Sequence, residues 1–153
     1  MGAEGTKRKG ELIDSHVHLD MPQFEGEVDE VLERARKAGV VEVLNVSYDA
    51  ESLKRTINLT ENYENVYGAC GIHPHDAIGF DDEAERAIKR CILRKKLVAV
   101  GEIGLDYYRD LSPREVQREV FRKQLGMALY FSKPVVIHSR ESFEDTVRIL
   151  DEE

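Results

Sequence analysis

The chain has 153 residues, 41% of them hydrophobic, which is enough to bury one ordinary core and predicts one domain or part of one. Its 30 acidic residues outnumber its 22 basic residues, and the net charge of −8 excludes a broad basic surface that would bind nucleic acid nonspecifically. A small local phosphate pocket is still compatible with this charge.

The N-terminal residues are rich in Gly, Lys and Arg and contain no apolar stretch. They lack the hydrophobic region of a signal peptide and the length of a membrane span. We therefore predict a flexible tail over residues 1–11, no membrane association and a cytoplasmic location. Cys70 and Cys91 fit no metal-binding spacing, so we expect both to be reduced and buried.

Taken in chain order, short runs rich in Val and Ile alternate with segments of helical periodicity. Near-continuous apolar runs of this kind are typical of parallel strands that are buried on both faces. The expected strands cover residues 12–17, 41–47, 66–72, 97–103 and 134–138.

Five helical segments follow these strands, and several have clear end signals. Gly39 is placed to end the first helix, while Asp49 and Asp81 are placed to cap the second and third. Ser112, followed by a proline, is expected to cap the fourth helix reciprocally with Glu115. The expected helices cover residues 28–38, 49–63, 82–91, 113–132 and 142–153.

This alternation predicts an α/β fold with a parallel sheet, about five strands and four to five helices. The pattern suits either an open doubly wound sheet or part of a barrel, and it does not separate the two. A complete eight-unit α/β barrel needs roughly 250 residues. If the strands belong to a barrel, the chain therefore forms an incomplete TIM-type (β/α) barrel.

Polar residues gather where the predicted strands end, which is where α/β folds place their chemistry. All 5 histidines of the chain lie at such ends. The residues concerned are His16 and His18 after the first strand, His73 and His75 after the third, Glu102 and Asp106 after the fourth, and His138 and Arg140 after the fifth.

Four of these residues are candidate metal ligands. His16 and His18 are two residues apart, so they point to the same face of a strand and can share one ion. Glu102 and His138 would complete a mixed nitrogen and oxygen ligand set, with Glu102 able to bridge two ions and to act as the catalytic residue. The alternatives are that the His-x-His pair is structural and that Glu102 is a solvated surface charge. The apolar run before Glu102 and its flanking glycines disfavour a solvated Glu102. Metal-activated water makes hydrolysis the expected reaction class.

Two further residues are candidate substrate contacts. Arg140 lies two residues after His138, and its planar guanidinium suits a phosphate oxygen. Its alternative is a surface ion pair with Glu141 or Glu144. His73 could contact substrate or a bound ion, and His73 or His75 could instead cap the next helix.

The remaining polar residues near the predicted site have weaker roles. The segment 106–109 is expected to form a polar and aromatic lip whose rings could stack on bases or simply pack in a loop. Asp14 is expected to be a structural hydrogen-bond partner and not a ligand.

Four ordered blocks of this sequence resemble the signature blocks of the TatD-type metal-dependent deoxyribonucleases. The resemblance covers residue 12 to the end of the chain. The blocks are Ile13-Asp-Ser-His-Val-His-Leu-Asp20, Gly71-Ile-His-Pro-His75, Val100-Gly-Glu-Ile-Gly-Leu-Asp-Tyr107 and Val136-Ile-His-Ser-Arg140.

The resemblance implies a TIM-barrel hydrolase of the amidohydrolase-like group that binds one to three divalent cations, with Mg, Mn and Zn all open. It implies cleavage of DNA phosphodiesters, often from the 3′ end. The acidic surface of the chain disfavours binding along a duplex and favours single-stranded ends as the substrate. The resemblance also implies that His16, His18, Glu102 and His138 ligate metal and that His73 and Arg140 contact phosphate.

The family pattern continues with another strand-end histidine and a late aspartate that this sequence does not contain. We therefore expect residues 12–153 to be the N-terminal part of a barrel with impaired activity, arising from a truncated gene, a split protein or a fragment. A complementing C-terminal polypeptide or self-association would then cover the open edges. The alternative functions are a metal-dependent amide or ester hydrolase and a non-catalytic metal-binding remnant.

Overall fold

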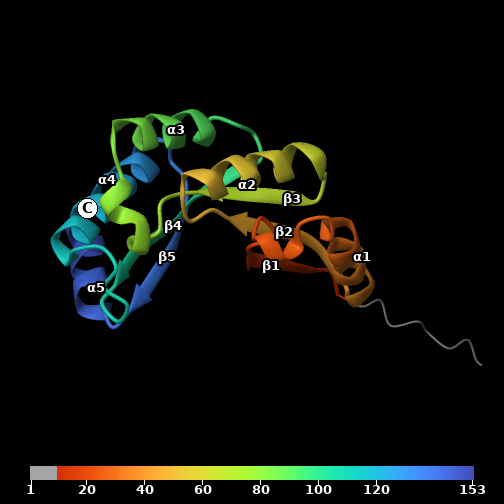
Figure 1. The fold of residues 1–153 in the computed structure, drawn as a ribbon, viewed down its shortest axis with the longest axis horizontal. Helices are drawn as coiled ribbons and strands as arrows, with labels where there is room; N and C mark the ends of the chain where they lie inside the picture. The colour runs from red at the N-terminus through yellow and green to blue at the C-terminus, as the bar shows by residue number, and fades with distance from the viewer. Residues whose placement is uncertain (1–9) are drawn as a thin grey trace, which may run out of the picture.

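The computed structural model describes residues 10–153, so most of the tail predicted at residues 1–11 lies outside the described residues. Within that range the strands form one five-stranded sheet in the order β1-β2-β3-β4-β5, and every neighbouring pair is parallel. Figure 1 follows this order from β1 and β2 at one side of the molecule to β4 and β5 at the other. The strands are β1 (Leu12–Val17), β2 (Val40–Val46), β3 (Val66–Cys70), β4 (Leu97–Asp106) and β5 (Val135–Arg140).

Each strand is followed by an α-helix, and two short 3-10 helices lie in the loops after β1 and β3. The strand order follows the chain without reversal, as in a barrel, whereas a doubly wound sheet reverses its order. The predicted incomplete (β/α) barrel is therefore confirmed as a half-barrel. The helices are η1 (Pro22–Phe24), α1 (Val28–Ala38), α2 (Ala50–Asn62), η2 (Pro74–Gly79), α3 (Asp82–Ile92), α4 (Arg114–Tyr130) and α5 (Phe143–Glu152).

The strands that carry the candidate site differ most from their predicted lengths. β4 continues to Asp106 and β5 to Arg140, because residues 104–106 pair with residues 138–140 across the two strands. β3 ends at Cys70, two residues before the predicted end. The backbone of Ile72 bonds instead to the Gln124 side chain, whose Oε1 accepts the Ile72 N–H at 2.8 Å and whose Nε2 donates to the Ile72 carbonyl at 3.0 Å.

A second buried glutamine of α4 holds β4 in the same way. Oε1 of Gln117 accepts the backbone N–H of Asp106 at 2.8 Å, and its Nε2 donates to the Asp106 carbonyl at 3.1 Å. Both glutamines are completely buried. Helix α4 therefore fixes the backbone at the ends of β3 and β4, where the candidate site residues begin.

Three of the predicted helix ends are confirmed. Asp49 accepts the N–H of Ser52 at 2.6 Å and Asp81 accepts that of Ala84 at 2.8 Å, as N-caps do. Gly39 ends α1 with a φ of 104°, a left-handed conformation that glycine adopts without a steric penalty.

The predicted reciprocal cap of α4 is wrong. The N-cap position is Pro113, with no side-chain capping bond, and the helix begins at Arg114. The buried Ser112 hydroxyl faces η2 instead: it accepts the Ile78 N–H at 3.0 Å and donates to the His75 carbonyl at 2.8 Å. Tertiary contact with the histidine-bearing loop outweighs the local capping pattern.

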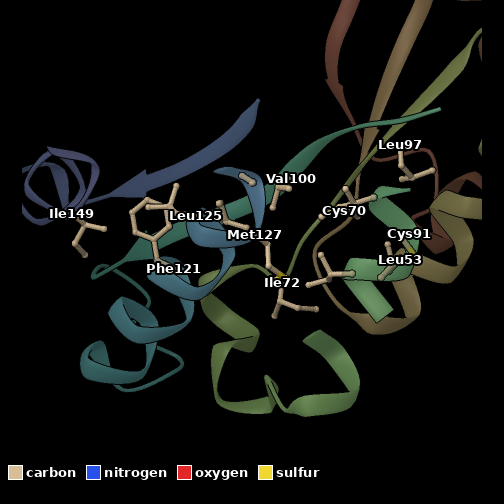
Figure 2. Packing of buried hydrophobic residues seen from close by; sticks show 14 of the residues in the cluster. Leu53, Cys70, Ile72, Cys91, Leu97, Val100, Phe121, Leu125, Met127 and Ile149 are labelled. Carbon is tan, nitrogen blue, oxygen red and sulfur yellow. The ribbon is translucent and has the colours of Figure 1, made fainter. Parts of the chain in front are cut away.

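The largest hydrophobic cluster lies between β3, β4 and the helices that cover them, and Figure 2 shows side chains from α2, α3, α4 and α5 meeting there. Phe121 and Ile149 are among its most buried members. Cys70 and Cys91 are both free and buried, as expected, and burial raises the pKa of the Cys70 thiol to about 12. This cluster supports the strands whose ends carry the site.

Candidate metal centre

All 5 histidines and Glu102 lie toward the carboxyl ends of the strands. His16 belongs to β1 and His18 follows it; His73 and His75 lie at the start of η2 after β3. Glu102 and His138 belong to β4 and β5. Parallel strands bring their ends to one edge of the sheet, so residues far apart in the sequence meet there.

The first cluster joins β1 to β4. The Nε2 atoms of His16 and His18 are 3.3 Å apart, and Oε2 of Glu102 is 3.4 Å from the first and 3.8 Å from the second. Ligand atoms bound about 2.0–2.2 Å from one tetrahedral ion are separated by about 3.3–3.6 Å. The separations of 3.3 and 3.4 Å lie in this range and that of 3.8 Å slightly exceeds it, so a small shift of the Glu102 carboxylate would let the three side chains bind one divalent ion.

The tautomer of His18 agrees with this fit. Its Nδ1 is 2.8 Å from the carbonyl oxygen of Val46, which can only accept a hydrogen bond. Nδ1 therefore carries the proton and donates it to Val46. Nε2 keeps its lone pair and faces His16 and Glu102, in the arrangement that orients histidine ligands in metal sites.

The second cluster contains His73, His75 and His138, whose candidate ligand atoms lie within 4.8 Å of one another. The ring of His73 is central, with centroids 4.2 Å from that of His75 and 4.3 Å from that of His138. Nδ1 of His138 is also 3.1 Å from Oε1 of Glu102. Glu102 therefore directs one carboxylate oxygen to each cluster.

The charge states follow from these contacts. Burial raises the pKa of Glu102, but the hydrogen bond with His138 and the surrounding imidazoles outweigh it, so the net shift is downward. The pKa of His138 is raised, chiefly by its hydrogen bond with Glu102. Burial lowers the pKa of His73 to about 3, so that ring is neutral at ordinary pH.

His73 also caps η2, as one of the sequence alternatives proposed. Its Nδ1 accepts the backbone N–H of His75 at 3.1 Å. A neutral ring that accepts at Nδ1 carries its proton on Nε2. His73 is therefore a hydrogen-bond donor at Nε2.

Asp106 is the residue whose place the sequence pattern did not indicate. It was expected on the lip of the site, but its side chain is completely buried at the end of β4. Its Oδ2 is 2.7 Å from Nε2 of His75 and 3.0 Å from Nε2 of His138. Residues two apart on a strand point to the same face, so Glu102, Gly104 and Asp106 share one face of β4. That spacing would have placed Asp106 at the site if β4 had been predicted to continue past Ile103.

The glycines that flank Glu102 allow close approach of backbone, and the neighbour is β5. A Cβ atom at Gly104 would lie 2.0 Å from the His138 carbonyl oxygen, and one at Gly101 would lie 2.6 Å from Cβ of Val136. The small residues therefore let β4 and β5 bring Glu102 and His138 together.

Arg140 lies at the exposed end of β5. Its guanidinium carbon is 4.0 Å from the ring centroid of Tyr108, a cation–π contact. Within residues 10–153 it forms no ion pair with Glu141 or Glu144, so that alternative is not observed. Tyr107 packs in its loop by donating its hydroxyl to Asp145 at 2.6 Å.

Asp14 accepts the backbone N–H of His16 at 3.2 Å, which confirms it as a hydrogen-bond partner. A pocket of about 210 Å³ opens between the two histidine clusters, with Tyr48 and Asp76 in its wall beside Glu102. A small polar group can therefore reach both clusters.

Histidines and a shared carboxylate at the carboxyl edge of a parallel half-barrel are the arrangement of an α/β-barrel metal centre. The family model described as TatD related DNase matches residues 13–153. The chain therefore belongs to the TatD family.

Individual relatives agree with this assignment. The chain is 41% identical over 142 residues to the uncharacterized metal-dependent hydrolase YabD of Bacillus subtilis, covering 93% of this chain and 56% of that protein. It is 31% identical over 140 residues to the 3′-5′ ssDNA/RNA exonuclease TatD of Cronobacter sakazakii, covering 92% and 53%. The crystal structure of the TatD homolog YjjV of Escherichia coli superposes with a TM-score of 0.86 at 35% identity, covering 92% and 55%.

The chain thus spans about half the length of the relatives it matches. Among the described residues, none of the helices combines the length and apolar character needed to cross a membrane. The cytoplasmic location stays a prediction.

Proposed function

We propose that this chain contributes the first half of a metal-dependent phosphodiesterase that removes nucleotides from the 3′ ends of single-stranded DNA. The observation that carries the proposal is the position of Glu102, which directs one carboxylate oxygen to the β1 histidines and the other to His138. Such a carboxylate can serve two ions at once.

In this proposal His16, His18 and Glu102 would hold one divalent cation, and Glu102 with His138 would hold a second. A cation bound there would lower the pKa of a water molecule and polarise the scissile phosphoryl group. The imidazole and carboxylate set accepts zinc and manganese, and magnesium with more water ligands.

The remaining site residues position the substrate. His73 offers its Nε2–H as a neutral donor to a phosphate oxygen, in agreement with its buried, unprotonated state. Arg140 offers a guanidinium that stacking on Tyr108 holds in place. The net charge of −8 disfavours movement along a DNA duplex and favours binding of the end of a single DNA strand in the pocket.

A partner that continues the sheet would complete the barrel. Within the described residues β1 and β5 are the two edges of the sheet, and Leu12 and Ile13 on β1 are 57% and 64% exposed. Unpaired edges with apolar side chains favour pairing with further strands. We propose that a polypeptide equivalent to the second half of a TatD relative, or a second copy of this chain, pairs there.

The test is cleavage of a 5′-labelled single-stranded oligonucleotide in Mn²⁺ or Mg²⁺, by the chain alone and mixed with the second half of a TatD relative. We expect shortening from the 3′ end, lost at least about 100-fold in Glu102→Gln because the shared ligand is removed. Glu144→Gln, a change at an exposed carboxylate of α5, is the matched control.

Activity that survives Glu102→Gln would overturn the role given to this site. Faster cleavage of small amides or esters than of the oligonucleotide would support the hydrolase alternative with the same metal chemistry. Metal binding without turnover, even in the mixture, would support the non-catalytic alternative.

A further inference from the structure

Asp106 makes four hydrogen bonds through a carboxylate that has no exposure to solvent. Oδ1 accepts the backbone N–H groups of Tyr108 at 3.0 Å and Arg109 at 2.8 Å. Oδ2 lies 2.7 Å from Nε2 of His75 and 3.0 Å from Nε2 of His138. A carboxylate with these four donors has every lone pair in use.

The geometry of these contacts identifies Asp106 as the acceptor. Oδ1 faces two backbone N–H groups, and Oδ2 faces two imidazole nitrogens at hydrogen-bond distance. An ionised carboxylate can only accept hydrogen bonds. The Nε2 atoms of His75 and His138 must therefore both carry protons.

The opposite side of the His138 ring faces a different carboxylate. Nδ1 is 3.1 Å from Oε1 of Glu102. Within the described residues no backbone N–H donates to that carboxylate, so it has lone pairs free for a cation. Two ligand atoms bound about 2.1 Å from one ion are about 3.0–3.4 Å apart, which matches the separation of Nδ1 and Oε1.

We propose that Asp106 is a positioning residue that holds the proton of His138 on Nε2 and so presents Nδ1 to the metal ion shared with Glu102. The inference rests on the proposed function, because it specifies how one ligand of that site is prepared. It treats the His73, His75 and His138 cluster as a set of N–H donors and not as a separate metal site. His18 has the opposite tautomer: its Nδ1–H donates to the Val46 carbonyl, and its Nε2 is free to bind metal.

The replacement Asp106→Asn tests this with little change of shape. The amide oxygen should remain on the Tyr108 and Arg109 N–H groups, which places the amide NH2 against the two rings. Nε2 of His138 must then accept, so the ring keeps its proton on Nδ1, where it bonds to Glu102 and blocks the metal. We expect the affinity for Zn²⁺ to fall about 10–100-fold.

Loss of negative charge alone could weaken cation binding, so Asp106→Ala is the comparison. It removes the same charge, but it leaves no amide N–H to force a proton onto Nδ1 of His138. We therefore expect Asp106→Ala to bind Zn²⁺ more tightly than Asp106→Asn does. Asp151→Asn, which makes the same chemical change at an exposed position of α5, is the control for general effects of the amide.

The ring itself gives the decisive readout, from ¹⁵N NMR of the histidine side chains in the wild-type chain. We expect His138 to carry a hydrogen-bonded Nε2–H without metal and to keep it in the Zn²⁺ form, with Nδ1 bound to the ion. An unprotonated Nε2 in the metal-free protein, or Zn²⁺ bound at Nε2, would overturn the inference, even if both variants fail to fold.

The two proposals fail in different ways. If the wild-type chain binds no Zn²⁺, the proposed metal function fails, while the metal-free spectrum still decides the proton position on His138. If the chain binds Zn²⁺ and Asp106→Asn binds it equally well, the function stands and the positioning role is wrong.

Discussion

Replacing Gln124 by Leu tests whether helix α4 fixes the strand end that carries His73. Gln124 is completely buried and closes two hydrogen bonds with the backbone of Ile72, at 2.8 and 3.0 Å. Leu fills a similar volume but leaves both backbone groups buried without partners. Each unpaired group costs about 1–3 kcal/mol, so we expect a loss of about 2–4 kcal/mol after partial relaxation.

The free energy of unfolding from urea denaturation measures this loss. Gln23→Leu makes the same chemical change at an exposed position of η1, where we expect a change within about 0.5 kcal/mol. If Gln124→Leu destabilises the protein no more than Gln23→Leu does, the backbone of Ile72 does not depend on α4 and the reasoning is refuted.

Three other predictions concern β4, β5 and the core. Gly104→Ala should cost more than about 3 kcal/mol of unfolding free energy, because φ is 140° and the new Cβ would lie 2.0 Å from the His138 carbonyl oxygen. Gly126→Ala in α4, whose new Cβ would have no atom within 4 Å, should stabilise the protein by about 0.5–1 kcal/mol. Equal effects of the two substitutions would contradict the packing account. Arg140→Ala should raise KM for the oligonucleotide while leaving Zn²⁺ affinity unchanged, and an unchanged KM would exclude a phosphate contact. Cys70, with its pKa raised by burial, should react with iodoacetamide at mildly alkaline pH only when urea unfolds the chain, and rapid labelling of the folded protein would show that the core is open.

The sequence predicted the elements of the fold well because their signals are local. Apolar runs and helix caps such as Asp49 and Gly39 depend on neighbouring residues, and the structure places them as expected. The half-barrel, in contrast, follows from the strand order, which no local pattern contains. Ser112 failed as a cap because its hydroxyl bonds to the η2 loop 34 and 37 residues earlier in the chain.

For the site, residue type predicted more than spacing did. Histidines at strand ends were recognised, and the structure brings His16, His18, Glu102 and His138 together. The buried partners were missed because their contacts are distant in sequence: Asp106 meets His75 and His138 across 31 and 32 residues, and Gln124 meets Ile72 across 52. Predicting that β4 continues past Ile103 would have been the first step to both Asp106 and its partners.

The most direct test of the central claim is anomalous diffraction at the zinc edge from crystals of the chain grown with Zn²⁺. We predict a peak within bonding distance of Nε2 of His16, Nε2 of His18 and Oε2 of Glu102, whose separations in the structure are close to those that one ion requires. Zinc bound only elsewhere on the chain, or no peak at saturating Zn²⁺, would contradict the account.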